Sequence, residues 1–406
     1  MPTNMKKKKE KLKFACPFCY SYHELDALLI KCAQTRCDNY GTNEKYGFFH
    51  PDNPQRCVKC KRLNKEIHCP NPHYGFSSGT EGLISSEMFD ASNIAIAIIG
   101  DEDSGKTCYM SSLLYSLKYT FPRFFSGDLA NADERSARFY GECYHNPVYN
   151  EKRLPSEKRG IKGDAIPICF YVRVKDPKSS KVRGVATLNY SSTNSELILK
   201  SAEEKKALLP EVVHFSEDQV KNADAIFLVV DPLTIPYVRK KVLERAAELG
   251  ELESVLRCCP EKERNANDLL KLISEKIDPN ISAGKKRINK YLAVVFTKLD
   301  ILERYYTPLS GSNTLVRESR HLETRSYNLP EHKHTSESVI DLIVKYMGDE
   351  TVDNLRRFKN YGFFAVSGLG KIPDADGNIP EGVAARRVLD PLLWVLAEND
   401  LIEKTW

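Results

Sequence analysis

The sequence lacks any long apolar run and carries little net charge. None of its apolar segments approaches the roughly 18 to 20 residues that a membrane-spanning helix needs. The first thirteen residues, MPTNMKKKKEKLK, are rich in lysine and do not continue into the apolar segment of a secretory signal. The formal net charge of +5 over 406 residues is too small to predict nucleic-acid or membrane binding by itself. We therefore expect a cytoplasmic protein whose residues 1–13 form a disordered tail.

The composition is otherwise ordinary, and no internal repeat is visible. Hydrophobic residues make up 41% and charged residues 28% of the chain, which is typical of a globular protein. A chain of this length has room for two or three domains with a sizeable core. Because a cytoplasmic protein keeps its thiols reduced, clustered cysteines indicate a metal site rather than disulfides.

The cysteines are concentrated near the N-terminus. Seven of the twelve occur between residues 16 and 69. They are Cys16 and Cys19 in CPFC, Cys32 and Cys37, Cys57 and Cys60 in CVKC, and Cys69 in HCPNPH. Two short pairs brought together give tetrahedral thiolate coordination, and four protein ligands make a structural zinc. We therefore predict a zinc-binding module over residues 14–75, which depends on metal for much of its folding free energy.

The zinc ligands can be grouped in more than one way. The simplest grouping follows the chain, with Cys16, Cys19, Cys32 and Cys37 on one zinc and Cys57, Cys60, Cys69 and His73 on the other. An interleaved cross-brace fits the spacing too. The eighth ligand is open, because His68 and His73 both flank Cys69 and His50 is a further candidate. Few aromatics alternate with basic residues here, so we expect a protein partner before a nucleic acid.

A glycine- and serine-rich linker, residues 76–92, leads to the segment NIAIAIIGDEDSGKT at 93–107. Its apolar run predicts a strand buried on both faces of a parallel sheet. The pattern G-x-x-x-x-G-K-T follows from Gly100 to Thr107. Next, an apolar stripe at helical spacing predicts a helix. The stripe consists of Met110, Leu113, Leu114 and Leu117.

This strand–loop–helix pattern predicts a phosphate-binding loop. Gly100 and Gly105 let the backbone curl so that successive N–H groups and the helix N-terminus face a phosphate chain. Lys106 would reach the β- and γ-phosphates, and the Thr107 hydroxyl would ligate Mg²⁺, so we assign both a catalytic role. The remaining candidate contacts of the loop are Asp103, Ser104 and Cys108.

Further apolar runs predict an α/β fold. They occur at 168–174, 182–188, 225–230, 291–297 and 363–367, with helical spacing within 236–276 and at 388–396. Strands separated by helices favour a three-layer sheet with right-handed crossovers. The polar segment 126–164 is where a mobile loop would approach the γ-phosphate. His145 lies in this segment, although a solvated loop histidine is the simpler interpretation. The remaining cysteines are expected to be ordinary buried thiols: Cys108, Cys143, Cys169, Cys258 and Cys259.

The tetrapeptide TKLD, from Thr297 to Asp300, ends the predicted strand at 291–297 and indicates the base. A carboxylate only accepts hydrogen bonds, so Asp300 can take two from the N1–H and exocyclic amine of guanine, a pair that adenine does not present. The aliphatic stem of Lys298 would lie along the base plane. The last predicted strand ends at Ser367, Gly368 and Leu369, where a backbone N–H could meet the guanine O6.

These motifs carry a family resemblance. GDEDSGKT, TKLD and SGL, in this order, resemble the G1, G4 and G5 motifs of Ras-like GTPases. More narrowly, the zinc ribbon in front, AIFLVVDPL, FFAVSGLG and the closing VLDPLLWVL resemble bacterial double-GTPase proteins of GTPase-associated conflict systems. The resemblance implies an α/β, three-layer P-loop (Ras-like) GTPase domain over 93–406, with an N-terminal zinc-ribbon-like module. It also implies GTP or GDP with Mg²⁺. The cysteine pairs themselves predict two zinc ions.

The chain departs from the Ras-like pattern where hydrolysis is organised. In place of Asp-x-x-Gly after the third strand it has Asn189, Tyr190, Ser191 and Ser192. The magnesium-ligating threonine of switch one is also hard to place, and Ser156 is only a weak candidate. We therefore expect a guanine-nucleotide switch with slow intrinsic hydrolysis, whose zinc module docks a partner. The alternative is a pseudo-GTPase adaptor without turnover.

A rival interpretation starts from the pattern IFLVVD, which in generic P-loop ATPases is the Walker B strand. Asp231 would then hold Mg²⁺, and TKLD would be a surface loop. In the Ras-like interpretation Asp231 merely ends the fourth strand near the base. We favour the latter, because Asp300 and the final serine strand make sense together only around guanine.

Overall fold

The computed structural model describes most of the chain from residue 91 onward and parts of the N-terminal region. The described ranges are 13–18, 20–24, 29–32, 34–38, 43–45, 57, 59–62, 67–71, 83–84, 88, 91–155, 168–190, 217–260, 266–279, 287–309 and 313–406.

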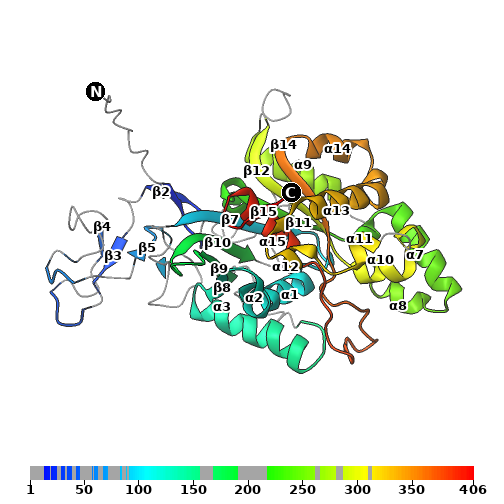
Figure 1. The fold of residues 1–406 in the computed structure, drawn as a ribbon, viewed down its shortest axis with the longest axis horizontal. Coiled ribbons are helices and arrows are strands. Elements are labelled where there is room, and N and C mark those ends of the chain that lie inside the picture. The colour runs from blue at the N-terminus through cyan, green and yellow to red at the C-terminus, as the bar shows by residue number, and fades with distance from the viewer. Residues whose placement is uncertain are drawn as a thin grey trace, which may run out of the picture.

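A seven-stranded sheet forms the centre of the molecule (Figure 1), with the strand order β14-β12-β11-β7-β10-β9-β8. The strands are β7 (Ser92–Gly100), β8 (Gly127–Asn131), β9 (Ile168–Lys175), β10 (Val182–Tyr190), β11 (Ala225–Val230), β12 (Ile288–Phe296) and β14 (Phe358–Ala365). Neighbouring strands are parallel from β14 to β10, whereas β9 is antiparallel to both β10 and β8. Each strand predicted from an apolar run overlaps one of these strands, and β8 is an addition.

Helices cover both faces of the sheet. The longer ones are α1 (Lys106–Tyr119), the π-helix η3 (Tyr140–Asn150), α7 (Pro236–Glu248), α9 (Ala266–Ile277), α13 (Leu329–Leu342) and α15 (Asp390–Glu398). The shorter ones are α2 (Phe121–Phe124), α3 (Glu134–Phe139), α8 (Leu252–Leu256), α10 (Leu299–Tyr305), α11 (Asn313–Val316), α12 (Arg320–Thr324) and α14 (Asp349–Leu355). Three 3-10 turns, η4 (Pro232–Thr234), η6 (Thr307–Leu309) and η7 (Val344–Tyr346), and a small pair of strands, β13 (Tyr327–Asn328) and β15 (Lys404–Thr405), complete this part.

The central strand β7 shows why the sheet has two cores. Ile94, Ile96 and Ile98 pack with α1, η3 and α15, whereas the alternate residues Ala97 and Ile99 pack with α7, α9, α10 and α13. Such alternation is the period of a strand, and a strand with both faces apolar must be covered on both sides. The resulting architecture is a three-layer α/β fold, as the sequence predicted.

Helix α1 buries the apolar stripe that the sequence predicted. Met110, Leu113, Leu114 and Leu117 are all fully buried. Each such side chain contributes about 1.5–3 kcal/mol relative to an exposed one. The helix starts directly after the glycine-rich loop, so its packing fixes the position of that loop against the sheet.

The polar segment after α2 is largely structured, although the sequence analysis expected a mobile loop there. Up to residue 155 it forms β8, α3 and the π-helix η3. Burial of Tyr140, Cys143 and Tyr144 anchors this segment to the core on the α1 side. The remainder of the predicted segment, including Ser156, lies outside the described residues.

The N-terminal module consists of short strands. β1 (Lys13–Ala15) and β2 (Tyr22–Glu24) form a hairpin, and a second sheet has the order β4-β3-β5-β6. The strands of that sheet are β3 (Leu29–Lys31), β4 (Asn43–Lys45), β5 (Ile67–His68) and β6 (Leu83–Ile84). Figure 1 shows β3, β4 and β5 to one side of the main sheet. The hairpin turn instead reaches into the main domain, because Tyr20 is fully buried in the core beside β7.

Candidate nucleotide site and metal cluster

The glycine-rich loop follows β7 at the carboxyl edge of the sheet. A Cβ atom on Gly100 would lie 2.4 Å from the backbone oxygen of Val229, so no side chain fits there. Asp103 and Gly105 have positive φ angles of 58° and 83°, the left-handed region that lets the loop curl back on itself. This geometry turns the loop toward the N-terminus of α1, as a phosphate-binding loop requires.

Two side chains of the loop are placed as a phosphate site needs. The ammonium of Lys106 is largely buried and donates a hydrogen bond to the carbonyl of Asp101, so it lies back over the loop. The hydroxyl of Ser104 is buried and has no hydrogen-bond partner among the described residues. A buried, unpaired hydroxyl is costly, and a ligand that accepts from it would remove that cost.

The TKLD residues meet the loop at the end of β12. The Thr297 hydroxyl donates to the backbone oxygen of Ser104 at 2.7 Å. Asp300 lies in the first turn of α10, where the Ser367 hydroxyl donates to its Oδ1 at 2.6 Å. The Ser367 oxygen in turn accepts from the backbone N–H of Gly370 at 2.7 Å. Residues that are about 190 and 70 positions apart in sequence therefore converge on one site, as parallel strand ends do.

Burial shapes the electrostatics of Asp300. Desolvation raises the pKa of this carboxyl above its ordinary value, and the hydrogen bond from Ser367 partly offsets that effect. Gly368 follows Ser367 and packs on α1, since a Cβ there would lie 2.9 Å from the backbone oxygen of Cys108. The SGL segment, whose Leu369 is buried, therefore connects Asp300 to the first turn of α1.

Asp231 belongs to this same side of the site. It ends β11, and its Oδ2 accepts from the Lys298 ammonium at 2.5 Å. Burial raises the pKa of Asp231, and the neighbouring Lys298 opposes that shift. Lys298 also donates to the backbone oxygen of Cys258 at 2.7 Å. Because Asp231 is paired with the TKLD lysine, the geometry favours the interpretation that places it near the base over the Walker B interpretation.

On the β10 side of the loop lies Tyr190, which the sequence singled out only as one of the residues in place of Asp-x-x-Gly. The Thr107 hydroxyl lies 3.1 Å from the hydroxyl of Tyr190, the last residue of β10. β10 and β11 flank β7 on opposite sides, so Tyr190 and Asp231 lie on different sides of the loop. Ser191 and Ser192 lie outside the described residues. Tyr190 could have been identified because it ends the strand next to the phosphate-loop strand.

A cluster of four cysteines forms a candidate metal centre in the N-terminal module. The Sγ atoms of Cys32, Cys37, Cys57 and Cys60 all lie within 4.8 Å of one another. Two of these separations, Cys32–Cys60 and Cys37–Cys57, are 3.8 Å. Ligands 2.3 Å from a tetrahedral zinc are about 3.8 Å apart, so this donor set fits a structural zinc.

The four-cysteine cluster differs from both groupings that the sequence left open. Neither the sequential grouping nor the cross-brace places Cys32 and Cys37 with Cys57 and Cys60. The reason is the antiparallel pairing of β3 with β5, in which Leu29 lies opposite His68. This register puts the end of β3, and hence Cys32, beside the chain entering β5, and leaves Cys69 at the opposite end. Cys19, His50 and His73 lie outside the described residues.

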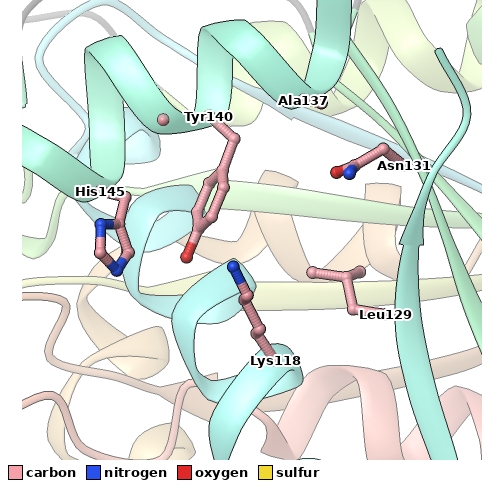
Figure 2. Close-up of a pocket in the computed structure, with 7 residues that line it drawn as sticks. Lys118, Leu129, Asn131, Ala137, Tyr140 and His145 are labelled. Atoms are coloured by element: carbon pink, nitrogen blue, oxygen red, sulfur yellow. The ribbon is translucent and has the colours of Figure 1, made fainter. Parts of the chain in front are cut away.

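A cavity of about 210 Å³ lies on the α1 side of the sheet, away from the phosphate loop. Figure 2 shows Lys118, Tyr140 and His145 around it. Lys118 is eleven residues after Thr107, or about 16 Å along α1. His145 lies on η3 among aromatic rings, with the Tyr115 and Tyr119 ring centres 6.1 and 6.3 Å away. It is therefore neither a loop residue nor a neighbour of the phosphate loop.

The described cysteines outside the zinc module form no disulfide. Cys143 and Cys169 are buried, whereas Cys108, Cys258 and Cys259 are partly exposed. In the part of the chain that the structure describes, every helix is too short or too polar to cross a membrane.

No protein-family model and no curated protein matches the chain. Several solved structures resemble it weakly. The GTPase-like domain of S. cerevisiae Ski7, bound to GDP and inorganic phosphate, is 14% identical, with a TM-score of 0.29. That match covers 76% of this chain, which spans half (50%) of the Ski7 chain.

Two further structures are similar at the same level. The Encephalitozoon cuniculi SAR1 GTPase in complex with GDP is 12% identical over 78% of this chain and 84% of its own, with a TM-score of 0.26. A bacterial selenocysteine-specific elongation factor, EF-Sec, is 12% identical, with a TM-score of 0.23. That match covers 76% of this chain and 29% of the EF-Sec chain. The fold assignment rests on this chain's own strand order, loop and helix α1. They form a three-layer, Ras-like P-loop GTPase fold with a zinc-ribbon-like module in front.

Proposed function

We propose that the protein binds guanine nucleotides at the loop 100–107 and the strand end 297–300. The observation that carries the proposal is the position of Asp300. Its carboxylate is held by Ser367, while Thr297 on the same strand end is tied to the backbone of the phosphate loop. One set of contacts therefore fixes the distance between a base-reading carboxylate and a phosphate site.

The chemistry of Asp300 selects the base. An ionised carboxylate accepts hydrogen bonds and donates none, so it matches the N1–H and 2-amino donors of guanine. Adenine offers an acceptor at N1, which would face the carboxylate without a proton between them. A site built to pair a polar group rejects the analogue that leaves that group unpaired. We therefore propose a strong preference for GTP and GDP over adenine nucleotides.

The phosphates would be held by the loop and by Lys106, whose ammonium lies over the loop. Thr107 would supply a hydroxyl ligand to Mg²⁺, and the ion would neutralise charge on the phosphates. The neighbour of Thr107 at the end of β10 is the neutral Tyr190, whereas the Ras-like pattern has an aspartate after this strand. A hydroxyl attracts the metal less than a carboxylate does, so we propose that intrinsic hydrolysis is slow.

Nucleotide competition tests the proposal. Fluorescent GDP bound to the purified protein is displaced with unlabelled GDP, GTP and ATP in the presence of Mg²⁺. We expect guanine nucleotides to compete at least about 100-fold better than ATP. The Lys106→Ala variant is the matched control, because it should lose binding of every nucleotide. Equal competition by ATP and GTP would refute the guanine proposal.

Binding without turnover is a second candidate function, favoured by the contact between Thr107 and the neutral Tyr190. Multiple-turnover phosphate release from GTP distinguishes the two candidates. Release that disappears in the Lys106→Ala variant supports a slow GTPase. Binding with no release above that of the variant supports a nucleotide-dependent adaptor.

We further propose that the zinc module docks a protein partner, in the cytoplasm and in a bacterial conflict or defence setting. Support comes from the sequence phrases that resemble conflict-system double GTPases, and from four cysteines that fit a structural zinc. Binding of nucleic acid through the module and its lysine tail is the competing idea. It predicts a steep fall in affinity as salt is raised, which titration of a labelled oligonucleotide would measure.

A further inference from the structure

The segments that start at Cys16 and Cys57 are closed by the same hydrogen bonds. In each, the N–H of the first cysteine donates to the carbonyl five residues on, at 3.0 Å in both cases. The residue four positions on donates to the carbonyl of that cysteine at 2.9 Å in both. That residue, Tyr20 or Lys61, has a φ angle of 59° or 57°. Two turns of the same sequence type, C-x-x-C, therefore share one conformation.

The second of these turns presents Cys57 and Cys60 to the four-cysteine cluster. Its left-handed residue is not a glycine, so the turn carries a conformational cost that must be offset elsewhere. Metal coordination by the two cysteines of the turn offsets such a cost. The same conformation at Cys16, with the bulky Tyr20 in the left-handed position, indicates that the first turn also faces an ion.

Two further donor groups lie in the same part of the module as Cys16. Among the described residues, these three do not form a closed set of ligand atoms within 4.8 Å as the four-cysteine cluster does, so an ion would draw Cys16 closer to the other two. In the β1–β2 hairpin, Phe14 is opposite His23, and Cys16 comes two residues after Phe14. Since alternate residues of a strand share a face, Cys16 and His23 are diagonal neighbours on one face of the hairpin. The His23 Nε2 atom lies 3.1 Å from the Sγ atom of Cys69. Cys16 and Cys69 are both buried in one apolar cluster.

We propose that Cys16, His23 and Cys69 hold a second structural metal ion, which their sulfur and imidazole ligands assign to zinc. Zinc bound at 2.3 Å from sulfur and 2.0–2.1 Å from nitrogen keeps the two ligand atoms about 3.6 Å apart. The observed 3.1 Å lies within about half an ångström of that separation. A closed structural site takes four ligands. Cys19, which the sequence pairs with Cys16, lies outside the described residues and is left to the experiment.

A simple S–H···N hydrogen bond between Cys69 and His23 is the competing explanation of the short contact. This hydrogen bond accounts for His23 and Cys69 but not for Cys16. It explains neither the burial of Cys16 nor the repeated C-x-x-C turn. A zinc accounts for all of these features, and it resolves the grouping of ligands that spacing left open. The outer cysteines of the module, Cys16 and Cys69, would then bind one ion. The four cysteines between them, Cys32, Cys37, Cys57 and Cys60, would bind the other.

The position of this second site differs from that of the first. The carbonyl of Pro17, inside the C-x-x-C turn, accepts from the Asn189 side chain at 2.6 Å. The Tyr20 hydroxyl, one residue beyond the turn, donates to the backbone oxygen of Ile96 on β7 at 3.1 Å. The second ion would therefore brace the middle of β7 and the end of β10, the two strands that lead to the phosphate loop and to Tyr190.

Zinc content and zinc spectroscopy of the full-length protein test the proposal. We expect about two zinc ions per chain, and about one in the His23→Ala variant. The His23→Cys variant, which keeps a ligand, should retain both. His73→Ala is the matched control and should also retain both. About one zinc in the unmodified protein, or about two in His23→Ala, would overturn the proposal.

If the His23→Ala variant does not fold, X-ray absorption at the zinc edge tests the proposal, because it identifies the atoms bound to zinc in the unmodified protein. One four-cysteine site alone gives a shell of sulfur only, near 2.3 Å. The proposed pair of sites adds a nitrogen contribution near 2.0–2.1 Å in the unmodified protein, and this contribution should vanish in His23→Cys. An all-sulfur shell in the unmodified protein would rule out His23 as a ligand.

Discussion

The two ends of the nucleotide site differ in how firmly they are built. On the base side, Thr297, Asp300 and Ser367 are joined to one another or to the phosphate loop through hydrogen bonds between strand ends. On the side proposed for magnesium, the Thr107 hydroxyl lies beside the neutral hydroxyl of Tyr190. For the proposed nucleotide site, this difference means that base recognition would be preorganised, whereas the groups that organise hydrolysis would not be supplied by the strand that usually carries them.

Lys106 is proposed to hold the phosphates of every nucleotide, so its loss should have the largest effect. Replacement by alanine removes charge-assisted hydrogen bonds to two phosphates, which we expect to weaken GDP and GTP binding at least about 100-fold. Titration with fluorescent GDP measures the change. The variant also loses the hydrogen bond from the Lys106 ammonium to the Asp101 carbonyl, which costs about 1 kcal/mol, so thermal stability should change little. Retained affinity in Lys106→Ala would mean that the loop does not hold phosphates.

Acid should weaken the base side selectively. Burial raises the pKa of Asp300 above its ordinary 3.8, and protonation replaces an acceptor with a donor. As pH falls through this raised pKa, GDP affinity should drop by about tenfold per unit, beginning above the pH at which an ordinary aspartate titrates. The Asp300→Asn variant is the control for protonation of the phosphates, and an identical pH profile in it would contradict the assignment.

Ser367 tests whether the base-side carboxylate is positioned. Replacement by alanine removes its hydrogen bond to Asp300, which should reduce GDP affinity about fivefold at a cost of about 1 kcal/mol. The preference for guanine should fall with it, because a carboxylate free to rotate discriminates less. Ser367→Thr keeps the hydroxyl and should restore most of the loss. Competition with ATP measures both, and unchanged selectivity in Ser367→Ala would indicate that Asp300 needs no support.

Loss of the Tyr190 hydroxyl should have the smallest effect of these changes on nucleotide affinity, and only when Mg²⁺ is present. The Tyr190→Phe variant keeps the ring and removes the hydroxyl that faces Thr107. We expect GTP affinity to fall about twofold with Mg²⁺ and not to change with a chelator, because the hydroxyl only orients Thr107 toward the ion. An equal loss under both conditions would show that Tyr190 acts on the nucleotide directly.

The sheet and the phosphate loop could be predicted because local sequence determines them. An apolar run such as 94–99 can be buried only inside a sheet, and only glycine fits at position 100, against the Val229 carbonyl. The pairing of Asp300 with Ser367 could also be anticipated, since both follow strands whose ends meet at one edge. The strand and the loop need no knowledge of which distant segments pair. The contact between Asp300 and Ser367 needs only the expectation that the ends of these two strands meet.

The features that sequence missed depend on long-range register. Spacing alone allows several groupings of the cysteines, and only the β3–β5 pairing separates Cys32 from Cys69. The same applies to Tyr190, whose contact with Thr107 follows from the place of β10 beside β7. The π-helix η3 was missed because its polar sequence, with Pro147 inside it, has the composition of a loop.

Base preference in the Asp300→Asn variant tests the central claim most directly. Xanthine carries an oxygen in place of the guanine 2-amino group, so it pairs with an amide that accepts from N1–H and donates to that oxygen. We predict that Asp300→Asn binds xanthosine diphosphate more tightly than GDP, a reversal in relative affinity of at least about 100-fold from the unmodified protein. A ratio of the two affinities that stays the same in the variant would contradict the account, because Asp300 would then not contact the base.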